Sequence, residues 1–575
     1  MHGGILIDRT ARYHSPRHNH SESALRCLAL LPVLLGAPAA LLAQDSLATD
    51  SGVPPQRIDS TFGPIGVIPD TGGLPLIRYV ELRRSDVFDS AETRKWYARL
   101  VNGLHIMTRP AVIERELLLG PGEPWDSARA AETARNLRRL GVFRQVAVDS
   151  VTTDSGLVMR VTAKDGWSTQ ADLRFRSTGG QTDWQTSLIE RNLLGTATRL
   201  VGRYRHTPDR NLWNAQFVQP RLFARSLSLA LRYEKRSDGN RSQVAIERPF
   251  FALSDRFGIS TLFEYRNERV FRFFDGFSEA GDSLRRRYVL GSVEAARALW
   301  ASPRGYLRVG VVGQVRRDDF APWPTQPAAS SVTGSAGVFV EWKNANFALS
   351  RGFLKLGQDE DVDLSRFVRF QVNTANEFLG YARDGVGGLL QVRLGTQFPA
   401  GFAWVDGRVN GVLTAAGVDS GSVTLGATGV FRPVGRHLAI LHADIGWLKD
   451  PIPSTEFDLG FARGPRGFPI HAFTGDRTYF ATAEYRVSLA EDLFKSLAVG
   501  VAGFADHGGA WYSGSARRTG TDVGFGLRLS PSRAADANPT RLDLAYRFKN
   551  DRERAGWVFV IASGLVFSIN PRGGQ

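Results

Sequence analysis

The sequence predicts a mainly β fold, a transmembrane antiparallel β-barrel preceded by one small α/β domain. The first observation is a period of two near the C-terminus, where apolar and polar residues fall on opposite faces of an extended strand. The apolar face comprises Leu542, Leu544, Tyr546 and Phe548. The second observation is that this alternation recurs from about Gly166 to Phe567 without a long apolar run. Many such strands behind an export signal indicate a closed barrel in an outer membrane, with its apolar face toward lipid and its polar face toward a lumen.

Length and composition agree with this fold class. The chain has 575 residues, which is enough for a large barrel and an accessory domain. Hydrophobic residues make up 43%, yet the mean hydropathy is −0.19, so apolar residues are abundant but dispersed, as alternation requires. The net charge is +15, but the arginines are spread along the strands together with Asp and Glu. This pattern favours a charged, hydrated lumen over a nucleic-acid surface, where basic residues would cluster.

The N-terminus has the form of a secretory signal. Several arginines precede an apolar run from Cys27 to Ala43, which is too short and too rich in Pro and Ala for a membrane span. We expect residues 1–43 to be a signal peptide cleaved after Ala43, and the long basic region leaves open a start codon downstream of Met1. Residues 44–75, rich in Pro, Gly, Ser and Asp, predict a flexible linker. Because Cys27 is the only cysteine, the mature chain would have no thiol for disulfides, catalysis or metal binding.

Residues 76–164 change to a mixed α/β pattern. Asp126 can cap a helix that Gly141 ends, and the segments that follow alternate as a hairpin. The expected elements are a strand at 76–82, helices at 91–104, 111–119 and 127–140, and strands at 142–151 and 156–163. The motifs ERELLLGPGEPWD and NLRRLGVFRQVAV in this order resemble a POTRA domain, with 91–108 as an additional helical insert. A generic α/β periplasmic domain is the alternative.

The pattern predicts that residues 165–568 form the barrel and that residues 569–575 form a C-terminal tail. Strands that cross an outer membrane need roughly 9–11 residues each, and about twenty alternating segments have suitable lengths. These candidate strands are 168–178, 183–194, 197–206, 212–219, 226–235, 241–250, 256–267, 286–298, 305–316, 332–342, 366–376, 387–397, 402–414, 421–432, 437–448, 477–489, 497–506, 522–530, 541–549 and 557–567.

Four motifs in the barrel segment point to one family. They are ERNLLGTATRL from Glu190, FARGPRGFP from Phe461, TYFATAEYRV from Thr478 and GFADHGGAWY from Gly503. Together they resemble the bacterial surface-antigen superfamily of POTRA-plus-barrel proteins, the BamA/TamA type, over about 76–567. The most specific element is Arg466-Gly467-Phe468, which is similar to the family's motif at the tip of the sixth extracellular loop. The resemblance implies sixteen strands and a loop that folds into the lumen.

Strand parity supplies partners for this loop motif. Glu484 shares a strand face with Thr482 and Arg486, so it should point into the lumen, and Asp506 lies in the next motif. The folded loop that the resemblance implies would bring Arg466 against Glu484 or Asp506, where bidentate geometry would hold it. The alternative is a solvated loop arginine. A seam between the first and last strands would involve Trp557, Phe559 and Phe567.

Catalytic, cofactor and metal motifs are absent from the sequence: there is no G-x-S-x-G, no H-E-x-x-H and no P-loop. His437 and His442 are five residues apart and fall on opposite strand faces, so they are poor joint ligands. His507 beside Asp506 lacks an accompanying nucleophile and oxyanion motif. We therefore expect neither an enzyme nor a bound cofactor or metal.

The resemblance implies a protein of the outer membrane that assists insertion, assembly or translocation of other proteins. Its expected partners are outer-membrane lipid, client outer-membrane or secreted polypeptides, and periplasmic chaperones or assembly lipoproteins, with no nucleic acid. A two-partner-secretion pore is one alternative, although such pores usually carry two POTRA modules. A passive channel or surface antigen on the same fold is the other.

Overall fold

The structure is a computed structural model and describes residues 75–178, 181–222, 226–271, 273, 283–327, 332–453, 455–460, 463–536 and 538–564. Four predictions lie outside these residues: the signal peptide, the linker up to residue 74, the C-terminal tail and Phe567. Within the described ranges, no helix is both long and apolar enough to cross a membrane.

An α/β domain begins the described chain, and its elements follow the predicted order. Its sheet has the order β1–β3–β2, with β1 parallel and β2 antiparallel to β3. The elements are β1 (Ile77–Ser85), a 3-10 helix η1 (Glu92–Arg94), α3 (Trp96–Leu104), α4 (Pro110–Glu114), α5 (Ser127–Arg139), β2 (Phe143–Thr153) and β3 (Gly156–Asp165). Asp126 caps α5 by accepting from the backbone N–H groups of Ala128 and Arg129. The core lies between the sheet and the helices, where Ile113 and Leu137 are fully buried.

Two helices differ from the prediction. The helix expected at 91–104 is split, because Lys95 has an extended backbone between η1 and α3. The helix expected at 111–119 ends at Glu114 as α4, because the Leu118 backbone N–H donates to the Thr133 hydroxyl of α5 instead of continuing the helix. At the second place, a tertiary contact overrides the local helical pattern.

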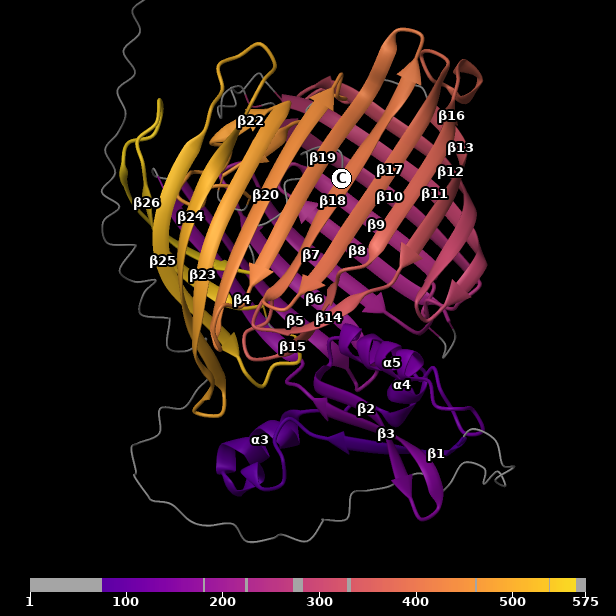
Figure 1. Cartoon of the computed structure of the whole chain (residues 1–575). Coiled ribbons are helices and arrows are strands. Elements are labelled where there is room, and N and C mark those ends of the chain that lie inside the picture. Colours follow the sequence, from indigo (N-terminus) through magenta and orange to yellow (C-terminus); the bar gives the residue numbers. More distant parts are fainter. Residues whose placement is uncertain are drawn as a thin grey trace, which may run out of the picture. The chain divides into compact units, whose positions relative to one another are not determined.

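Twenty antiparallel strands form a closed barrel (Figure 1). They follow chain order, and β27 closes on β4. The strands are β4 (Thr169–Thr178), β5 (Gln181–Leu193), β6 (Thr198–His206), β7 (Asn211–Gln219), β8 (Ser228–Arg236), β9 (Gly239–Arg248), β10 (Phe257–Phe271), β11 (Ser283–Ser302), β12 (Gly305–Pro322), β13 (Val332–Asn344), β16 (Arg366–Ala375), β17 (Gly385–Phe398), β18 (Gly401–Thr414), β19 (Gly417–Phe431), β20 (His437–Lys449), β23 (Arg477–Leu493), β24 (Leu497–Trp511), β25 (Gly520–Pro531), β26 (Thr540–Arg547) and β27 (Gly556–Ser563). Each predicted segment overlaps one of these strands, so the count from the sequence is confirmed. The strand number of sixteen that the family resemblance implies is wrong. Every alternating segment pairs within the barrel, and none of them forms a hairpin outside it.

The sequence does not predict two small hairpins between barrel strands. β14 (Phe347–Arg351) and β15 (Asp359–Asp363) follow β13, and β21 (Phe457–Leu459) and β22 (Phe473–Gly475) follow β20. Strands this short show too few repeats for a period of two to be recognised. Because successive barrel strands run in opposite directions, the β14–β15 hairpin lies at the barrel end joined to the α/β domain, and the β21–β22 hairpin lies at the opposite end.

The two faces of the barrel differ as alternation predicts. On β20, Leu441, Ile445 and Trp447 are exposed on the outer face, whereas His442 and Asp444 are buried on the inner face. Inner-face arginines pair with carboxylates of nearby strands, as in Arg205–Asp183, Arg286–Asp318 and Arg393–Asp406. These pairs account for the arginines that are spread along the strands, and the outer face suits lipid.

Candidate functional site

The candidate site is built by the long loop between β20 and β23. Its β21–β22 hairpin packs against the inner barrel wall, where Phe457 and Phe473 are buried together with Phe480 of β23. This apolar contact folds the loop inward, so its tip at 463–471 lies in the lumen. Gly464, with a φ of 108°, allows the chain to turn into the tip.

Arg466 is held at the loop tip by carboxylates of the barrel wall. Its Nε and Nη2 donate to the two oxygens of Asp506 at 2.6 and 3.1 Å, which is bidentate geometry. Its Nη1 donates to Glu484 at 3.0 Å and to Asp543 at 3.3 Å. The guanidinium also lies over the ring of Phe504, 3.7 Å from the centroid. The structure thus places Arg466 between the two carboxylates that the sequence singles out.

This position leaves Arg466 only 1% exposed. A buried charge is costly unless its donors have partners, and here Nε, Nη1 and Nη2 all donate to carboxylates. Burial by itself lowers the pKa of Arg466, but the carboxylates of Asp506, Glu484 and Asp543 outweigh burial and raise the pKa well above its ordinary value. The guanidinium therefore stays charged, and charge pairing holds the loop tip in place.

Further arginines surround these carboxylates. Glu484 also accepts from Arg486 Nε at 2.5 Å and lies 3.1 Å from Arg528 Nη2. Arg528 Nη1 donates to Asp543 at 2.5 Å, and Arg541 Nη1 donates to the same carboxylate at 3.3 Å. The site therefore combines the loop tip with the inner faces of four consecutive strands, β23 to β26. We name as the luminal arginine cluster Arg466, Glu484, Arg486, Asp506, Arg528, Arg541 and Asp543.

The two residues after Arg466 fix the tip in a different way. The Gly467 backbone N–H donates to Asp522 Oδ2 at 2.9 Å. A Cβ at position 467 would lie 3.0 Å from the Cβ of Asp522, so glycine permits this close approach. Phe468 is fully buried, and its ring lies directly against Gly520 at the start of β25. The tip is thus held by a charge, a backbone hydrogen bond and an apolar ring.

Several residues around Arg466 are not predicted by the sequence motifs. Arg541 and Asp543 lie on the polar face of a predicted strand, so parity alone could have included them. Phe504 shares a strand face with Asp506. An aromatic ring on a luminal face can indicate that a cation lies over it, as Arg466 does here. Asp522 carries no such signal, because its role depends on where the loop tip lies.

The seam between the last and first strands is short. In the described part of the chain, β27 pairs with β4 only at Val560 and Ile561, whereas its pairing with β26 runs along the whole strand. Trp557 and Phe559 lie on β27, with 60% and 50% of their surface exposed. Both have register partners on β26, and neither has a described partner on β4. These two predicted seam residues therefore lie on a seam strand, but outside the part that pairs with β4.

A second segment crosses the lumen at the end that carries the α/β domain. Phe353, between β14 and β15, packs against Phe402 on the inner wall. Its carbonyl accepts from Arg486 Nη1 at 2.6 Å, which joins the hairpin to the luminal arginine cluster. Gln358 donates to the Ala534 carbonyl in the turn between β25 and β26 at 2.7 Å. The hairpin therefore reaches from the β13–β16 connection to the strands that hold the loop tip.

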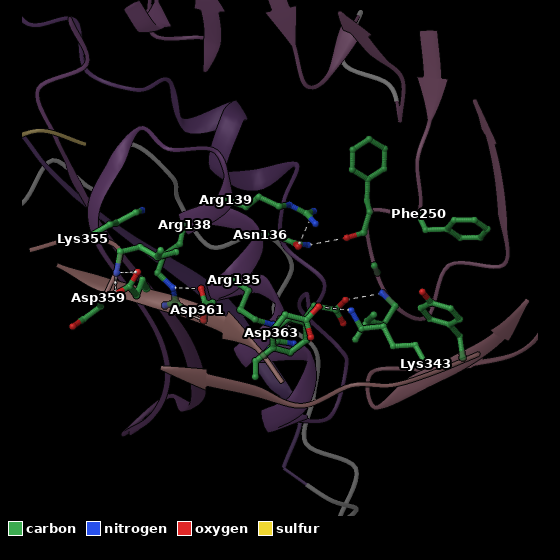
Figure 2. Close-up of a pocket in the computed structure, with 18 of the residues that line it drawn as sticks. Arg135, Asn136, Arg138, Arg139, Phe250, Lys343, Lys355, Asp359, Asp361 and Asp363 are labelled. Carbon is green, nitrogen blue, oxygen red and sulfur yellow. Dashed lines mark hydrogen bonds and ion pairs between the residues drawn. The ribbon is translucent and has the colours of Figure 1, made fainter. Parts of the chain in front are cut away.

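A charged pocket of about 460 Å³ lies between this hairpin and α5 (Figure 2). Arg138 of α5 donates to both oxygens of Asp361 at 2.7 Å, and Lys343 pairs with Asp363 at 2.8 Å. Asn136 donates to a carbonyl in the turn between β9 and β10 at 3.2 Å. The bonds of Arg138 and Asn136 connect α5 of the α/β domain to the end of the barrel. The charged groups Arg138, Asp361, Lys343 and Asp363 are therefore paired with one another across the pocket.

Glu360 is a buried carboxyl in this hairpin. It accepts from the backbone N–H groups of Phe353 and Leu354 at 2.8 Å and is 5% exposed. Burial raises the pKa of Glu360 to about 7, although the backbone donors act to lower it. The hairpin thus contains a group that titrates near neutral pH.

The fold and the site define a class of protein: a twenty-strand β-barrel with an apolar outer face, whose charged lumen is crossed by two of the chain's own segments. Among the described residues, no group of three or more His, Cys, Asp or Glu side chains is placed to hold a metal ion. No family model matches the chain, and no curated protein matches it.

Solved structures of similar architecture exist. BamA from Haemophilus ducreyi lacking POTRA domains 1–3 has a TM-score of 0.38 and 11% identity, covering 85% of this chain and 84% of that one. CdiB from Acinetobacter baumannii has a TM-score of 0.41 and 10% identity, covering 79% and 71%. CdiB from Escherichia coli has a TM-score of 0.40 and 13% identity, covering 88% and 94%.

Replacing Arg466 by Ala should release the loop while the barrel persists. The change leaves the buried carboxylate of Asp506 without its cation, a cost of roughly 3–5 kcal/mol for a buried pair. We expect faster proteolysis between Ile452 and Asp476, with the folded barrel still migrating faster on a gel before boiling than after. Arg466→Lys should restore protection only partly, because a point charge lacks the planar fork. Arg517→Ala, whose guanidinium lies over Trp511 at the same barrel end, is the control. A loop as protected in Arg466→Ala as in the wild type would contradict the charge-pairing account.

Gly520→Ala should loosen the tip without removing a charge. A Cβ at position 520 would lie 2.3 Å from the Phe468 ring, so the ring must leave its place, at a cost of roughly 1–3 kcal/mol for overpacking. Hydrogen exchange of 463–471 should rise. Gly503→Ala is the matched control, because its Cβ would meet nothing nearer than 4.0 Å. Equal exchange in both variants would show that Phe468 does not hold the tip.

Protection of the β14–β15 hairpin should fall as pH rises. A carboxyl with an ordinary pKa of 4.5 and a folded pKa of about 7 binds its proton more tightly when folded. Its stabilisation is therefore complete below pH 4.5 and is lost as pH rises through about 7. Hydrogen exchange of 347–363, corrected for intrinsic rates, should be faster at high pH in the wild type. Glu360→Gln cannot titrate and should remove this dependence, whereas the same dependence in Glu360→Gln would assign it to another group.

Proposed function

We propose that the chain is an outer-membrane protein with a periplasmic POTRA-like domain at 76–164 and a barrel at 165–568. Its export signal would be 1–43. We propose further that it assists insertion, assembly or translocation of other proteins. The exposed apolar side chains of the outer strand faces support a place in lipid. The proposed work needs no covalent chemistry, cofactor or metal.

The observation that carries the proposal is the short seam. Each hydrogen bond contributes about 0.5–1.5 kcal/mol net, so opening the pairing at Val560 and Ile561 costs less than opening a fully paired strand such as β26. An open seam would expose the unpaired edges of β4 and β27. A client strand could then pair with these edges before it enters the bilayer.

The α/β domain supports the same proposal with a second edge. In its sheet β2 pairs with β3 on one side, and no strand in the described part of the chain covers the other side. An extended client segment could add there as a further strand. The domain leads directly into β4, one of the two seam strands. Periplasmic chaperones or assembly lipoproteins would act at this end of the barrel.

A two-partner-secretion pore is the second candidate, and one observation favours it. Twenty strands enclose a wider lumen than sixteen, which suits passage of a polypeptide once the loop tip and the β14–β15 hairpin move. The described residues contain one α/β domain, whereas such pores usually carry two POTRA modules, and this counts against it. A passive channel is less favoured, because two segments of the chain cross the lumen.

The test is to lock the seam. Phe175→Cys with Ile561→Cys places two thiols on register partners across the seam, and Cys27 is the only native cysteine. In cells depleted of the native copy, we expect this oxidised variant not to restore the outer-membrane proteome, and a reductant to restore its activity. Ala545→Cys with Val558→Cys bridges β26 and β27 and should act like the wild type under both conditions.

The depletion itself separates the candidates. Loss of many outer-membrane proteins supports an assembly role, and loss of one secreted polypeptide supports the secretion pore. An unchanged set of outer-membrane and secreted proteins would overturn both and leave the passive channel. Full activity of the oxidised seam variant would rule out opening at β4 and β27.

A further inference from the structure

Helix α3 carries an apolar stripe that the rest of the α/β domain does not cover. Trp96, Leu100 and Leu104 follow one another at four-residue intervals and therefore lie on one face of the helix. They are 59%, 54% and 67% exposed, and Ile106 just after the helix is 54% exposed. The opposite face packs inward, where Ala98 is fully buried. The helix is therefore amphipathic, with an apolar face turned away from its own domain.

Basic side chains border this stripe. Three of them are exposed and form no ion pair within the described chain: Arg94, Lys95 and Arg99. The carboxylates close by in sequence are engaged elsewhere, since Glu92 pairs with Arg533 at 2.8 Å and Asp89 with Lys164 at 2.6 Å. An apolar stripe that contains Trp and is bordered by unpaired basic residues is typical of a helix that lies on an anionic membrane surface.

The helix is anchored beside the turn between β23 and β24. Arg533 joins Glu92, just before α3, to Asp492 at 2.9 Å, and it also donates to the Lys495 carbonyl at 2.9 Å. Exposed apolar residues continue along the outer face of β23 into this turn: Tyr485, Leu489, Leu493 and Phe494. The apolar stripe of α3 and the lipid-facing surface of the barrel therefore share one end of the barrel.

The other end of the insert is tied close to the seam. The Arg109 backbone N–H donates to the Gly195 carbonyl in the turn between β5 and β6 at 2.9 Å, and Asn192 donates to the Ile106 carbonyl at 3.3 Å. β5 is the neighbour of seam strand β4. The insert thus runs along the barrel rim on both sides of the seam, where the outer faces of the strands would meet the headgroups.

We propose that α3 docks on the bilayer surface next to the seam, with its apolar stripe among the lipids and Arg94, Lys95 and Arg99 against anionic phospholipid headgroups. The proposal rests on the membrane placement proposed above. A second copy of the chain could cover the apolar stripe, but it would explain neither the basic border nor the continuity with the outer face of β23. Docked in this way, α3 pins the α/β domain to the membrane at the place where a client would enter.

The test is a spin label that reports lipid contact in the full chain reconstituted into vesicles. In a Cys27→Ser background, Leu104→Cys places the label on the stripe, and Ser155→Cys places it on the exposed turn between β2 and β3. The vesicles contain phosphatidylethanolamine with or without phosphatidylglycerol. With phosphatidylglycerol, we expect collisions with dissolved oxygen, relative to a water-soluble nickel complex, to rise at least about threefold at position 104. Position 155 should not change.

The combined variant Arg94→Gln, Lys95→Gln, Arg99→Gln should return the label at position 104 to its water-exposed value. A sample whose barrel shows no heat-dependent gel shift would count against the membrane placement itself. A folded barrel with position 104 as water-exposed as position 155 would overturn the docking of α3 alone. If the label at position 104 became shielded from water without phosphatidylglycerol, and more so at higher ratios of protein to lipid, a second copy of the chain would cover the stripe.

Discussion

Three arginines converge on one carboxylate, and most of the luminal site depends on this contact. Glu484 accepts from Arg466 of the loop and Arg486 of its own strand, and it lies against Arg528 of β25. In a buried setting, a cation left without its partner is strongly destabilising. The loop tip and the wall are therefore stable only as a set. Glu484 and Asp543 each pair with cations from more than one segment, which explains why the site needs neighbouring strands as well as a loop.

The same contact links the two segments that cross the lumen. Arg486 donates from Nε to Glu484 and from Nη1 to the carbonyl of Phe353 in the β14–β15 connection. A change at the loop tip therefore alters the hydrogen bond between Arg486 and Glu484. Because the same guanidinium also donates to the Phe353 carbonyl, its hydrogen bond with the hairpin changes as well. Groups that share one partner couple in this way, and their effects do not add. The two closures, which begin at opposite ends of the barrel, are thus not independent.

Periodicity finds every barrel strand, because each strand must present one face outward and one face to a charged lumen. For the same reason it places Glu484 inside, whereas Asp506 is singled out by its motif. It cannot find the β14–β15 hairpin, which is held by tertiary contacts such as those of Phe353 with Arg486 and of Gln358 with Ala534. Nor can it assign Asp522, whose partner is a loop backbone far away in sequence. The family resemblance supplies the loop tip, but a tip motif carries no information on the number of strands.

Strands joined by buried ion pairs lie next to the seam, where the described strand pairing is short. The luminal arginine cluster ties β23, β24, β25 and β26 together with buried charges. The following strand, β27, closes on β4 at only two described positions. Separating strands within the cluster would leave buried charges without partners. Separating β27 from β4 breaks a few backbone hydrogen bonds and the side-chain hydrogen bonds of Ser563 with Arg174 and Asp172. The opening proposed above would therefore be confined to the seam, where it would expose the edge of β27.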